Sequence, residues 1–186
     1  KNLKIINKLI GPVLDRGPSD PFWAASPFVY KKQHEFNMFY TSAYDYKFID
    51  RIGKKHHLYD IKLRVSNSPE YFGTNSETIV SGSNSSEYAI ARPCLIDLDG
   101  DDHLFYCKRE SEFSKDYMIF HKKLNSKRKE IATSNDNLVN IKFIDNLDFK
   151  KCQCYPYLIK YSKYLILFYN GSNYGKSGFR IAYKEI

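Results

Sequence analysis

The sequence repeats one pattern three times at a long and nearly constant spacing. Each copy has a proline, two or three apolar residues, a polar turn, and an aromatic run whose tyrosine lies 13 residues after the proline. The prolines are 66 and 63 residues apart, and the successive proline–tyrosine pairs are Pro27 and Tyr40, Pro93 and Tyr106, and Pro156 and Tyr169. A fixed period of this length indicates one supersecondary unit that is used repeatedly and stacked on its neighbours. The repeat therefore favours a β-propeller.

Each repeat is predicted to form one four-stranded blade. The proline is expected to begin the first strand, where no donor to the ladder is needed. A polar turn, clearest at Asp99-Gly100, leads into the second strand. The third strand is expected at an aromatic-x-Ile motif that occurs once per repeat, at residues 59–61, 117–119 and 179–181. Weaker fourth strands are expected near residues 77–80 and 141–144, and the third repeat stops after its third strand.

The predicted fold is all-β, and an aromatic content of 16% agrees with it because aromatic residues favour strands. A closed propeller needs about four to eight blades, so three repeats do not close a ring. We expect residues 1–186 to form a single propeller domain that is incomplete in this chain. The missing blades would lie in an N-terminal segment outside this sequence or in a partner chain.

The net charge of +8 raises the question of a nucleic-acid partner. The 22 lysines outnumber the 7 arginines and are scattered along the chain, whereas arginine is the better reader of phosphate and guanine. We therefore expect no nucleic-acid partner and a solvated basic surface, with an anionic polymer or a membrane headgroup as the alternative. The apolar runs are too short to cross a bilayer and no secretion signal opens the chain, so a cytoplasmic protein is expected.

The cysteines do not form a recognisable metal motif. They lack the second pair and the histidine spacing of a zinc site, and they are Cys94, Cys107, Cys152 and Cys154. Buried free thiols are the expected state. No phosphate-cradling glycine loop and no nucleophile elbow occurs. We therefore expect neither a metal nor a cofactor.

Three stretches of the chain carry a family resemblance. They are residues 23–29 (Trp-Ala-Ala-Ser-Pro-Phe-Val), residues 87–106 with Ala-Arg-Pro and Leu-Phe-Tyr, and residues 154–175 with Tyr-Asn-Gly and Tyr-Gly. Together they resemble the C-terminal three blades of the five-bladed propellers related to glycoside hydrolase families 43 and 32. The likeness is greatest to glycosidase-like members associated with bacterial surface polysaccharide genes.

The resemblance implies an axial pocket lined by residues beside each blade-opening proline. Family hydrolases place their general acid two residues before such a proline, and this sequence has Ala25, Ala91 and Cys154 there. Glu87 and Asp148 lie six and eight residues before their prolines and are the candidate catalytic carboxylates. The alternative for both is a solvated loop carboxylate.

Six residues are candidates for binding a sugar: Trp23, Arg92, Tyr155, Asn170, Asn173 and Tyr174. The lone tryptophan can stack on a sugar face or pack between blades. Arg92 offers a forked donor to a carboxylate, a phosphate or hydroxyls, or it forms a structural ion pair. The asparagines can pair with sugar hydroxyls or serve as turn residues.

The function expected from the sequence is that of a glycosidase-like, carbohydrate-active protein acting on or binding a sugar of a bacterial surface polysaccharide. The alternative is a non-catalytic glycan-binding or assembly module of a polysaccharide-biosynthesis enzyme. Turnover that depends on Glu87 or Asp148 would favour the enzyme, and sugar binding without turnover would favour the module.

Overall fold

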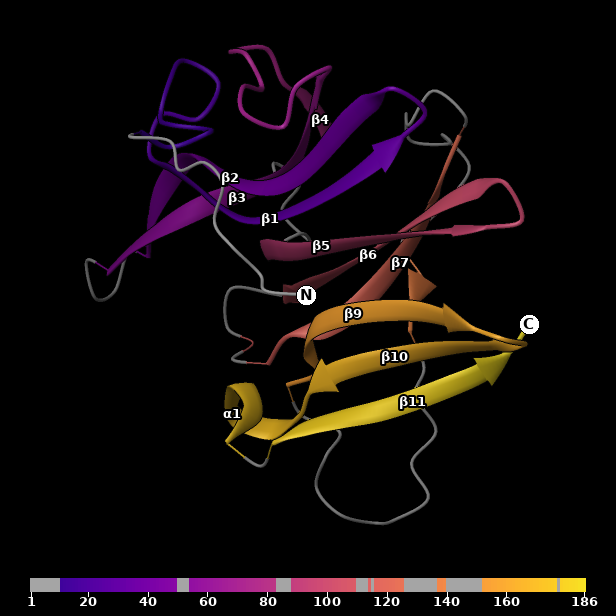
Figure 1. Ribbon diagram of the computed structural model, residues 1–186. Helices are drawn as coiled ribbons and strands as arrows, with labels where there is room; N and C mark the ends of the chain where they lie inside the picture. The colour runs from indigo at the N-terminus through magenta and orange to yellow at the C-terminus, as the bar shows by residue number, and fades with distance from the viewer. Residues whose placement is uncertain are drawn as a thin grey trace.

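The computed structural model describes residues 11–49, 54–82, 88–109, 114, 116–125, 137–139, 152–176 and 178–186. These residues form three antiparallel sheets that follow one another along the chain and are stacked in the same order (Figure 1). A four-residue helix, α1 (Ser172–Gly175), lies between the last two strands. In the described part of the chain, no helix has the length and apolar character that a membrane span requires.

The sheets contain consecutive strands with nearest-neighbour pairing. The first has the order β1-β2-β3-β4, with β1 (Trp23–Lys32), β2 (Glu35–Ile49), β3 (Lys54–Ser66) and β4 (Glu77–Val80). The second has the order β5-β6-β7-β8, with β5 (Tyr88–Leu98), β6 (Asp101–Arg109), β7 (Met118–Leu124) and β8 (Asn137–Leu138). The third has the order β11-β10-β9, with β9 (Cys154–Tyr161), β10 (Tyr164–Asn170) and β11 (Phe179–Glu185).

The all-β prediction is confirmed, and so is the fourth strand at residues 77–80. The strand expected at residues 141–144 lies outside the described residues, and the described fourth strand of the second sheet is β8. The prediction that each proline begins its strand is wrong. The strands begin two to five residues earlier, at Trp23, Tyr88 and Cys154, because each strand accommodates its proline at a break in the ladder.

Two apolar layers hold the three sheets together. Phe39 and Ile61 of the first sheet pack with Leu104 and Tyr106 of the second in one fully buried cluster. A second cluster joins Cys94, Phe105 and Ile119 of the second sheet to Leu158, Leu167 and Tyr169 of the third. Alternation of side chains along each strand supplies these inward faces, since successive residues point to opposite sides of a sheet. The middle sheet is therefore covered on both faces.

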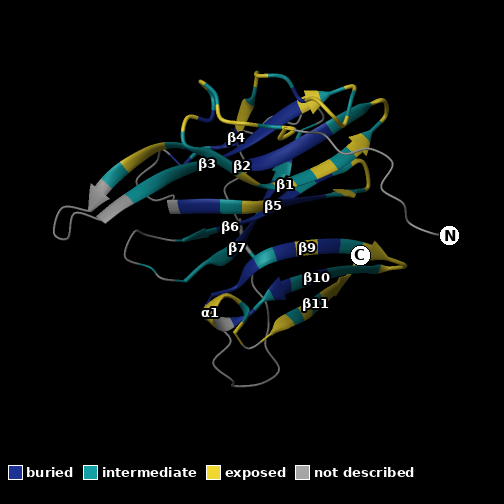
Figure 2. Ribbon diagram, turned by 60° about the vertical axis from the view of Figure 1, so that its left-hand side comes forward, coloured by how far each residue is buried: buried dark blue, intermediate teal, exposed yellow. Residues whose placement is uncertain are grey.

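The outer face of the third sheet is apolar and open to solvent (Figure 2). Phe168 on β10 pairs with Tyr157 on β9 and with Ile181 on β11, so these three side chains share one face. Tyr183 and Phe179 on β11 are 76% and 70% exposed. The opposite face of the same sheet is the one that packs on the second sheet.

The expectation of buried free thiols is confirmed: all four cysteines are buried and unpaired by disulfide. Burial raises the pKa of Cys94 to about 11 and that of Cys107 to about 12. At neutral pH both thiols are therefore protonated, which leaves them weak nucleophiles.

A histidine pair in the second sheet is expected to make the protein sensitive to acid. The Nδ1 atom of His103 lies 2.7 Å from the Nε2 atom of His121, and the rings are stacked. Burial, followed by the nearby His103, lowers the pKa of His121 from 6.5 to about 4. The folded protein keeps this imidazole neutral, whereas the unfolded chain takes up its proton near pH 6.5. The contribution of the neutral His121 imidazole to the free energy of unfolding is thus fully present above pH 6.5 and is lost as the pH falls toward 4.

Urea unfolding between about pH 7.5 and pH 4.5 measures this effect. The wild-type free energy of unfolding is expected to fall by on the order of 2 kcal/mol more than that of His121→Gln. The exposed His34 supplies the control, because His34→Gln should keep the wild-type pH profile. Parallel pH profiles for His121→Gln and the wild type would contradict the assignment.

Candidate functional site

The first strand of every sheet has the same backbone irregularity directly before its proline. Ser26, Arg92 and Tyr155 have φ values of 54°, 60° and 58°. The pairing register shifts at each of these places, as it does at a β-bulge. A bulge redirects a side chain that would otherwise follow the alternation of the strand. Non-glycine residues at positive φ cost about 1–3 kcal/mol each and cluster at functional sites.

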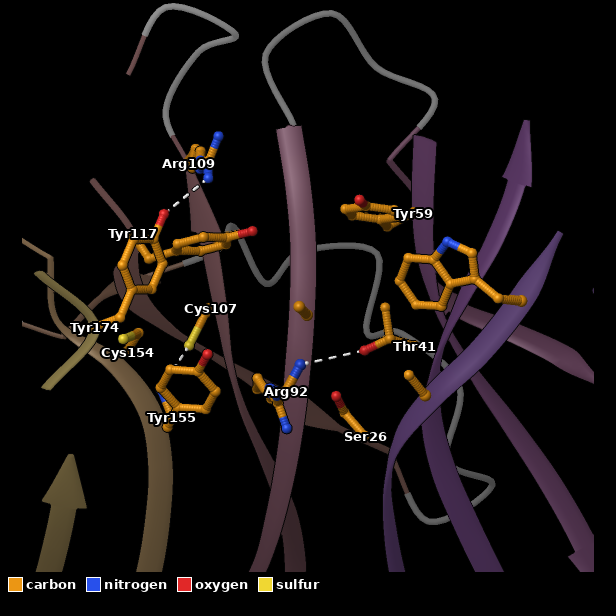
Figure 3. A pocket seen from close by; sticks show the side chains of 13 residues that line it. Ser26, Thr41, Tyr59, Arg92, Cys107, Arg109, Tyr117, Cys154, Tyr155 and Tyr174 are labelled. Carbon is orange, nitrogen blue, oxygen red and sulfur yellow. Dashed lines mark hydrogen bonds between the residues drawn. The ribbon is translucent and has the colours of Figure 1, made fainter. Parts of the chain in front are cut away.

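The three redirected side chains meet at one cavity of about 250 Å³ (Figure 3). The cavity lies where β1, β5 and β9 come side by side, so all three sheets contribute to it. Its lining residues are Trp23, Ala25, Ser26, Thr41, Tyr59, Ala91, Arg92, Cys107, Arg109, Tyr117, Cys154, Tyr155 and Tyr174. The residue before each proline of the sequence repeat thus lies at an equivalent place around a single cavity.

Aromatic rings form the walls of the cavity. The rings of Trp23 and Tyr59 are 4.9 Å apart between centroids on the side of the first sheet. Tyr117 and Tyr174 meet edge to face at 5.9 Å on the opposite side in Figure 3. Tyr155 extends this aromatic wall from β9. Burial raises the pKa of Tyr59 and Tyr117, so their hydroxyls stay protonated and can donate hydrogen bonds at neutral pH.

Two guanidinium groups lie among these rings. The Arg92 group stands over the Tyr155 ring, 4.4 Å from its centroid. The Arg109 group stands over the Tyr117 ring at 4.6 Å and donates a hydrogen bond to the Tyr174 hydroxyl at 2.9 Å. Among the described residues that line the cavity there is no aspartate or glutamate. The described lining is therefore aromatic and cationic.

A cluster of buried thiols adjoins the cavity. Cys107, Cys152 and Cys154 are buried together, and Cys107 and Cys154 also reach the lining. The backbone N–H of Tyr155 donates to the Cys107 sulfur at 3.2 Å. Burial raises the pKa of Cys154 as well as that of Cys107. Cys107 and Cys154 therefore act as small neutral packing residues, and Cys107 also holds the Tyr155 backbone through its hydrogen bond.

Four of the six binding candidates from the sequence line the cavity: Trp23, Arg92, Tyr155 and Tyr174. Asn170 and Asn173 are not among the described lining residues. Glu87 and Asp148, the candidate catalytic carboxylates, lie outside the described residues. Ala25, Ala91 and Cys154, at the positions where the resemblance implies a general acid, all face the cavity.

The turn after β10 explains where the two asparagines lie. The Asn170 side chain donates through Nδ2 to the Tyr174 carbonyl at 3.3 Å. Asn173 and Tyr174 both adopt left-handed φ values, 53° and 59°. Gly175 completes the turn, because a Cβ there would lie 2.9 Å from the Asn170 side-chain nitrogen. This arrangement presents the Tyr174 ring to the cavity.

Sequence reasoning missed Thr41, Tyr59, Arg109 and Tyr117 as lining residues. The repeat contained a signal for two of them, because Tyr59 and Tyr117 are the aromatic residues of the aromatic-x-Ile motif in two successive repeats. Their counterpart Phe179 is 70% exposed and does not line the cavity. The motif alone therefore could not tell a cavity residue from a surface residue.

No family model matches the sequence, and no curated protein matches it. Solved structures do match the fold. An endo-1,4-β-xylanase from Bacteroides thetaiotaomicron superposes with a TM-score of 0.59 at 19% identity, over 88% of this chain and 50% of its own. A family 117 glycoside hydrolase from Zobellia galactanivorans has a TM-score of 0.62 at 12% identity, over 86% of this chain and 50% of its own.

An arabinanase from Bacillus subtilis agrees with them, with a TM-score of 0.52 at 19% identity over 86% of this chain. The chain spans about half the length of each of these three proteins. Their fold is the five-bladed β-propeller. The three stacked sheets are therefore blades of a five-bladed β-propeller, the fold of these glycoside hydrolases, and the chain forms part of it.

Proposed function

We propose that this protein is a glycosidase-like, carbohydrate-active protein that holds a sugar in the cavity between its three blades. The observation that carries the proposal is the convergence of Trp23, Tyr59 and Tyr155 with guanidinium and hydroxyl donors around about 250 Å³. Aromatic faces pack against the C–H face of a sugar, while placed polar groups pair with its hydroxyls. In the complete propeller this cavity would be the axial pocket.

The fold of the structural neighbours supports a role in glycan chemistry, and the resemblance of residues 23–29, 87–106 and 154–175 supports a narrower one. The substrate in this proposal is a sugar of a bacterial surface polysaccharide. The protein would act in the cytoplasm, without a cofactor and without a nucleic-acid partner.

The proposal includes a hydrolytic form and a binding form. Glycoside hydrolysis needs two carboxylates flanking the scissile bond. In the hydrolytic form Glu87 and Asp148 supply carboxylates to the cavity. In the binding form the protein is a non-catalytic glycan-binding or assembly module. That form is favoured by the uncharged side chains of Ala25, Ala91 and Cys154, which occupy the positions before the three prolines.

We further propose that residues 1–186 belong to one propeller domain and that the outer face of the third sheet packs against another blade. The first two interfaces between sheets are made by faces of the same apolar character. Tyr157, Ile181 and Tyr183 would occupy the corresponding interface. The blade would come from residues outside this sequence or from a partner chain.

Trp23 makes the test of sugar binding direct. It is the only tryptophan of the chain and it lines the cavity, so its fluorescence is expected to change saturably when a sugar enters. A panel of neutral and acidic monosaccharides and oligosaccharides would be titrated. Calorimetry on Trp23→Ala is expected to show about tenfold weaker binding, because the variant loses a stacking contact.

The control is Tyr71→Ala, which removes a ring that is 67% exposed and outside the cavity and should leave affinity unchanged. Any ligand that binds is then tested for turnover in the form of its glycosides. Loss of turnover in Glu87→Gln or Asp148→Asn would identify the hydrolytic form, and binding without turnover would identify the module. Absence of a fluorescence change and of binding heat with every sugar would overturn the proposed function.

A further inference from the structure

We propose that the sugar held by this protein carries an anionic group, of which a uronic-acid carboxylate is the simplest form, and that Arg92 binds this group. The inference rests on the proposed function, because it specifies the ligand of the same cavity. It starts from a contrast between Arg92, which is exposed at the cavity, and three cations that the fold partly or almost fully buries beside carboxylates.

Three partly or almost fully buried cations elsewhere in the described residues lie beside carboxylates. The Lys32 ammonium lies 2.9 Å from the buried carboxylate of Asp102. Lys62 and Arg64, both almost fully buried, share the carboxylate of Asp20 at 3.6 Å and 2.5 Å. These pairs follow the rule that a charge withdrawn from water needs an opposite charge beside it.

Among the described residues, Arg92 has no such carboxylate partner. In the described part of the chain its guanidinium forms no ion pair and no hydrogen bond, and its neighbour is the face of the Tyr155 ring at 4.4 Å. The group is exposed to solvent at the cavity, so water can hydrate it when no ligand is bound. A ligand that displaces this water must replace its hydrogen bonds or pay the desolvation of a charge.

The backbone holds Arg92 ready for such a ligand. Its φ of 60° places it in the bulge before Pro93, and its N–H donates to the Thr41 hydroxyl at 3.2 Å. The Tyr155 ring restricts the guanidinium plane from one side. A guanidinium group whose backbone and plane are restricted in this way loses little conformational entropy on binding. This favours a bidentate contact with a planar anion.

The rest of the cavity has the same polarity. Arg109 contributes a second positive charge to the lining, over Tyr117 and beside the Tyr174 hydroxyl. No acidic side chain is found among the described lining residues. A neutral sugar would leave the Arg92 guanidinium without a counter-charge, whereas a sugar acid supplies one. The aromatic walls are suited to the ring of the same ligand.

The test compares matched ligands on matched variants, by calorimetry and Trp23 fluorescence. Glucuronate, glucose 6-phosphate, glucose and the sugar-free acid succinate are titrated into the wild type, Arg92→Gln, Arg92→Lys and Arg16→Gln. Arg16 is exposed and lies outside the cavity, so Arg16→Gln controls for the loss of one charge. Unfolding curves verify that every variant is folded.

The expected result is that an anionic sugar binds about 10- to 100-fold more tightly than glucose, as charge-assisted hydrogen bonds predict. Arg92→Gln should remove most of this preference, while its affinity for glucose changes less than about threefold. Arg92→Lys should keep part of the preference, because the positive charge remains without the paired N–H donors of the guanidinium group. Arg16→Gln should match the wild type. Preference for glucuronate over glucose 6-phosphate would assign the anion as a carboxylate, and the reverse order as a phosphate.

The outcomes separate this inference from the proposed function. Equal affinity for glucose and the anionic sugars, or an anion preference that survives Arg92→Gln, would overturn the inference and leave sugar binding intact. Succinate binding as tightly as glucuronate would show an anion site that does not recognise sugars, which overturns the proposed function. Failure of every sugar to bind would overturn both.

Discussion

Replacement of Asp20 by alanine is expected to lower the free energy of unfolding by about 3–5 kcal/mol, a large part of the stability of a typical domain. Asp20 is fully buried and is the shared partner of three side chains. Arg64 lies 2.5 Å from one carboxylate oxygen, Lys62 lies 3.6 Å from the other, and Tyr40 donates its hydroxyl at 3.1 Å.

The effect arises from the charges that remain. Arg64 and Lys62 are 4% and 6% exposed, so removal of Asp20 leaves two cations in a poorly hydrated site without a counter-charge. Neither can move readily to water, because Arg64 also donates to the Gly73 carbonyl and Lys62 donates to the Ser19 carbonyl. The cluster thus fastens the segment before β1 to the face of the first sheet.

Urea unfolding followed by Trp23 fluorescence measures the change. The matched control is Glu185→Gln, which breaks an ion pair of 2.8 Å with Lys163 whose side chains are 64% and 57% exposed. That change should cost no more than about 1 kcal/mol. Adding Arg64→Met to Asp20→Ala should recover part of the loss, since it removes one stranded charge. Equal costs for Asp20→Ala and Glu185→Gln would show that the cluster is not a buried ionic network.

Replacement of Phe39 by alanine is expected to cost about 3–5 kcal/mol for a different reason. Phe39 is fully buried where the first sheet packs on the second, in the cluster that contains Ile61 and Leu104. Its ring also stacks on Tyr30 at 6.3 Å. Truncation removes apolar burial and leaves a cavity between two sheets whose backbones cannot close it.

Tyr71→Ala also truncates an aromatic side chain to alanine, at a ring that is 67% exposed and outside the named strands, and should cost less than about 1 kcal/mol. Phe39→Leu, which keeps most of the volume, is expected to fall between the two and serves if Phe39→Ala does not fold. A cost for Phe39→Ala as small as that for Tyr71→Ala would show that the interface between the first two sheets is not tightly packed.

The repeat of proline and aromatic segments was sufficient to predict the blades. Alternating side chains and turn residues such as Asp99-Gly100 are local signals, and the strand pairs β5–β6 and β9–β10 lie where these signals predict them. The beginnings of the first strands were predicted wrongly. A proline has no N–H to donate to a ladder, which suggested a strand end, but within a packed sheet it can sit at a bulge with pairing on both sides.

Only part of the candidate site could be predicted from such local signals. Trp23, Arg92 and Tyr155 could be proposed because they lie close before the prolines. Tyr59, Tyr117 and Arg109 come from third strands or strand ends, and whether such residues reach a cavity depends on how neighbouring sheets stack. Phe179, which holds the same place in the third repeat, points instead to solvent.

The sequence by itself determined the number of units, their strand content and the position before each proline, because these follow from local periodicity and from the missing N–H of proline. The tertiary structure decided which side chains share a cavity. Ser26 and Arg92 are 66 residues apart and Arg92 and Tyr155 are 63 apart, and the three meet only because apolar faces stack the sheets with β1 and β9 on either side of β5. The two guanidinium groups of the cavity likewise come together only in the folded chain, since Arg92 and Arg109 lie on different strands and each faces an aromatic ring of the lining.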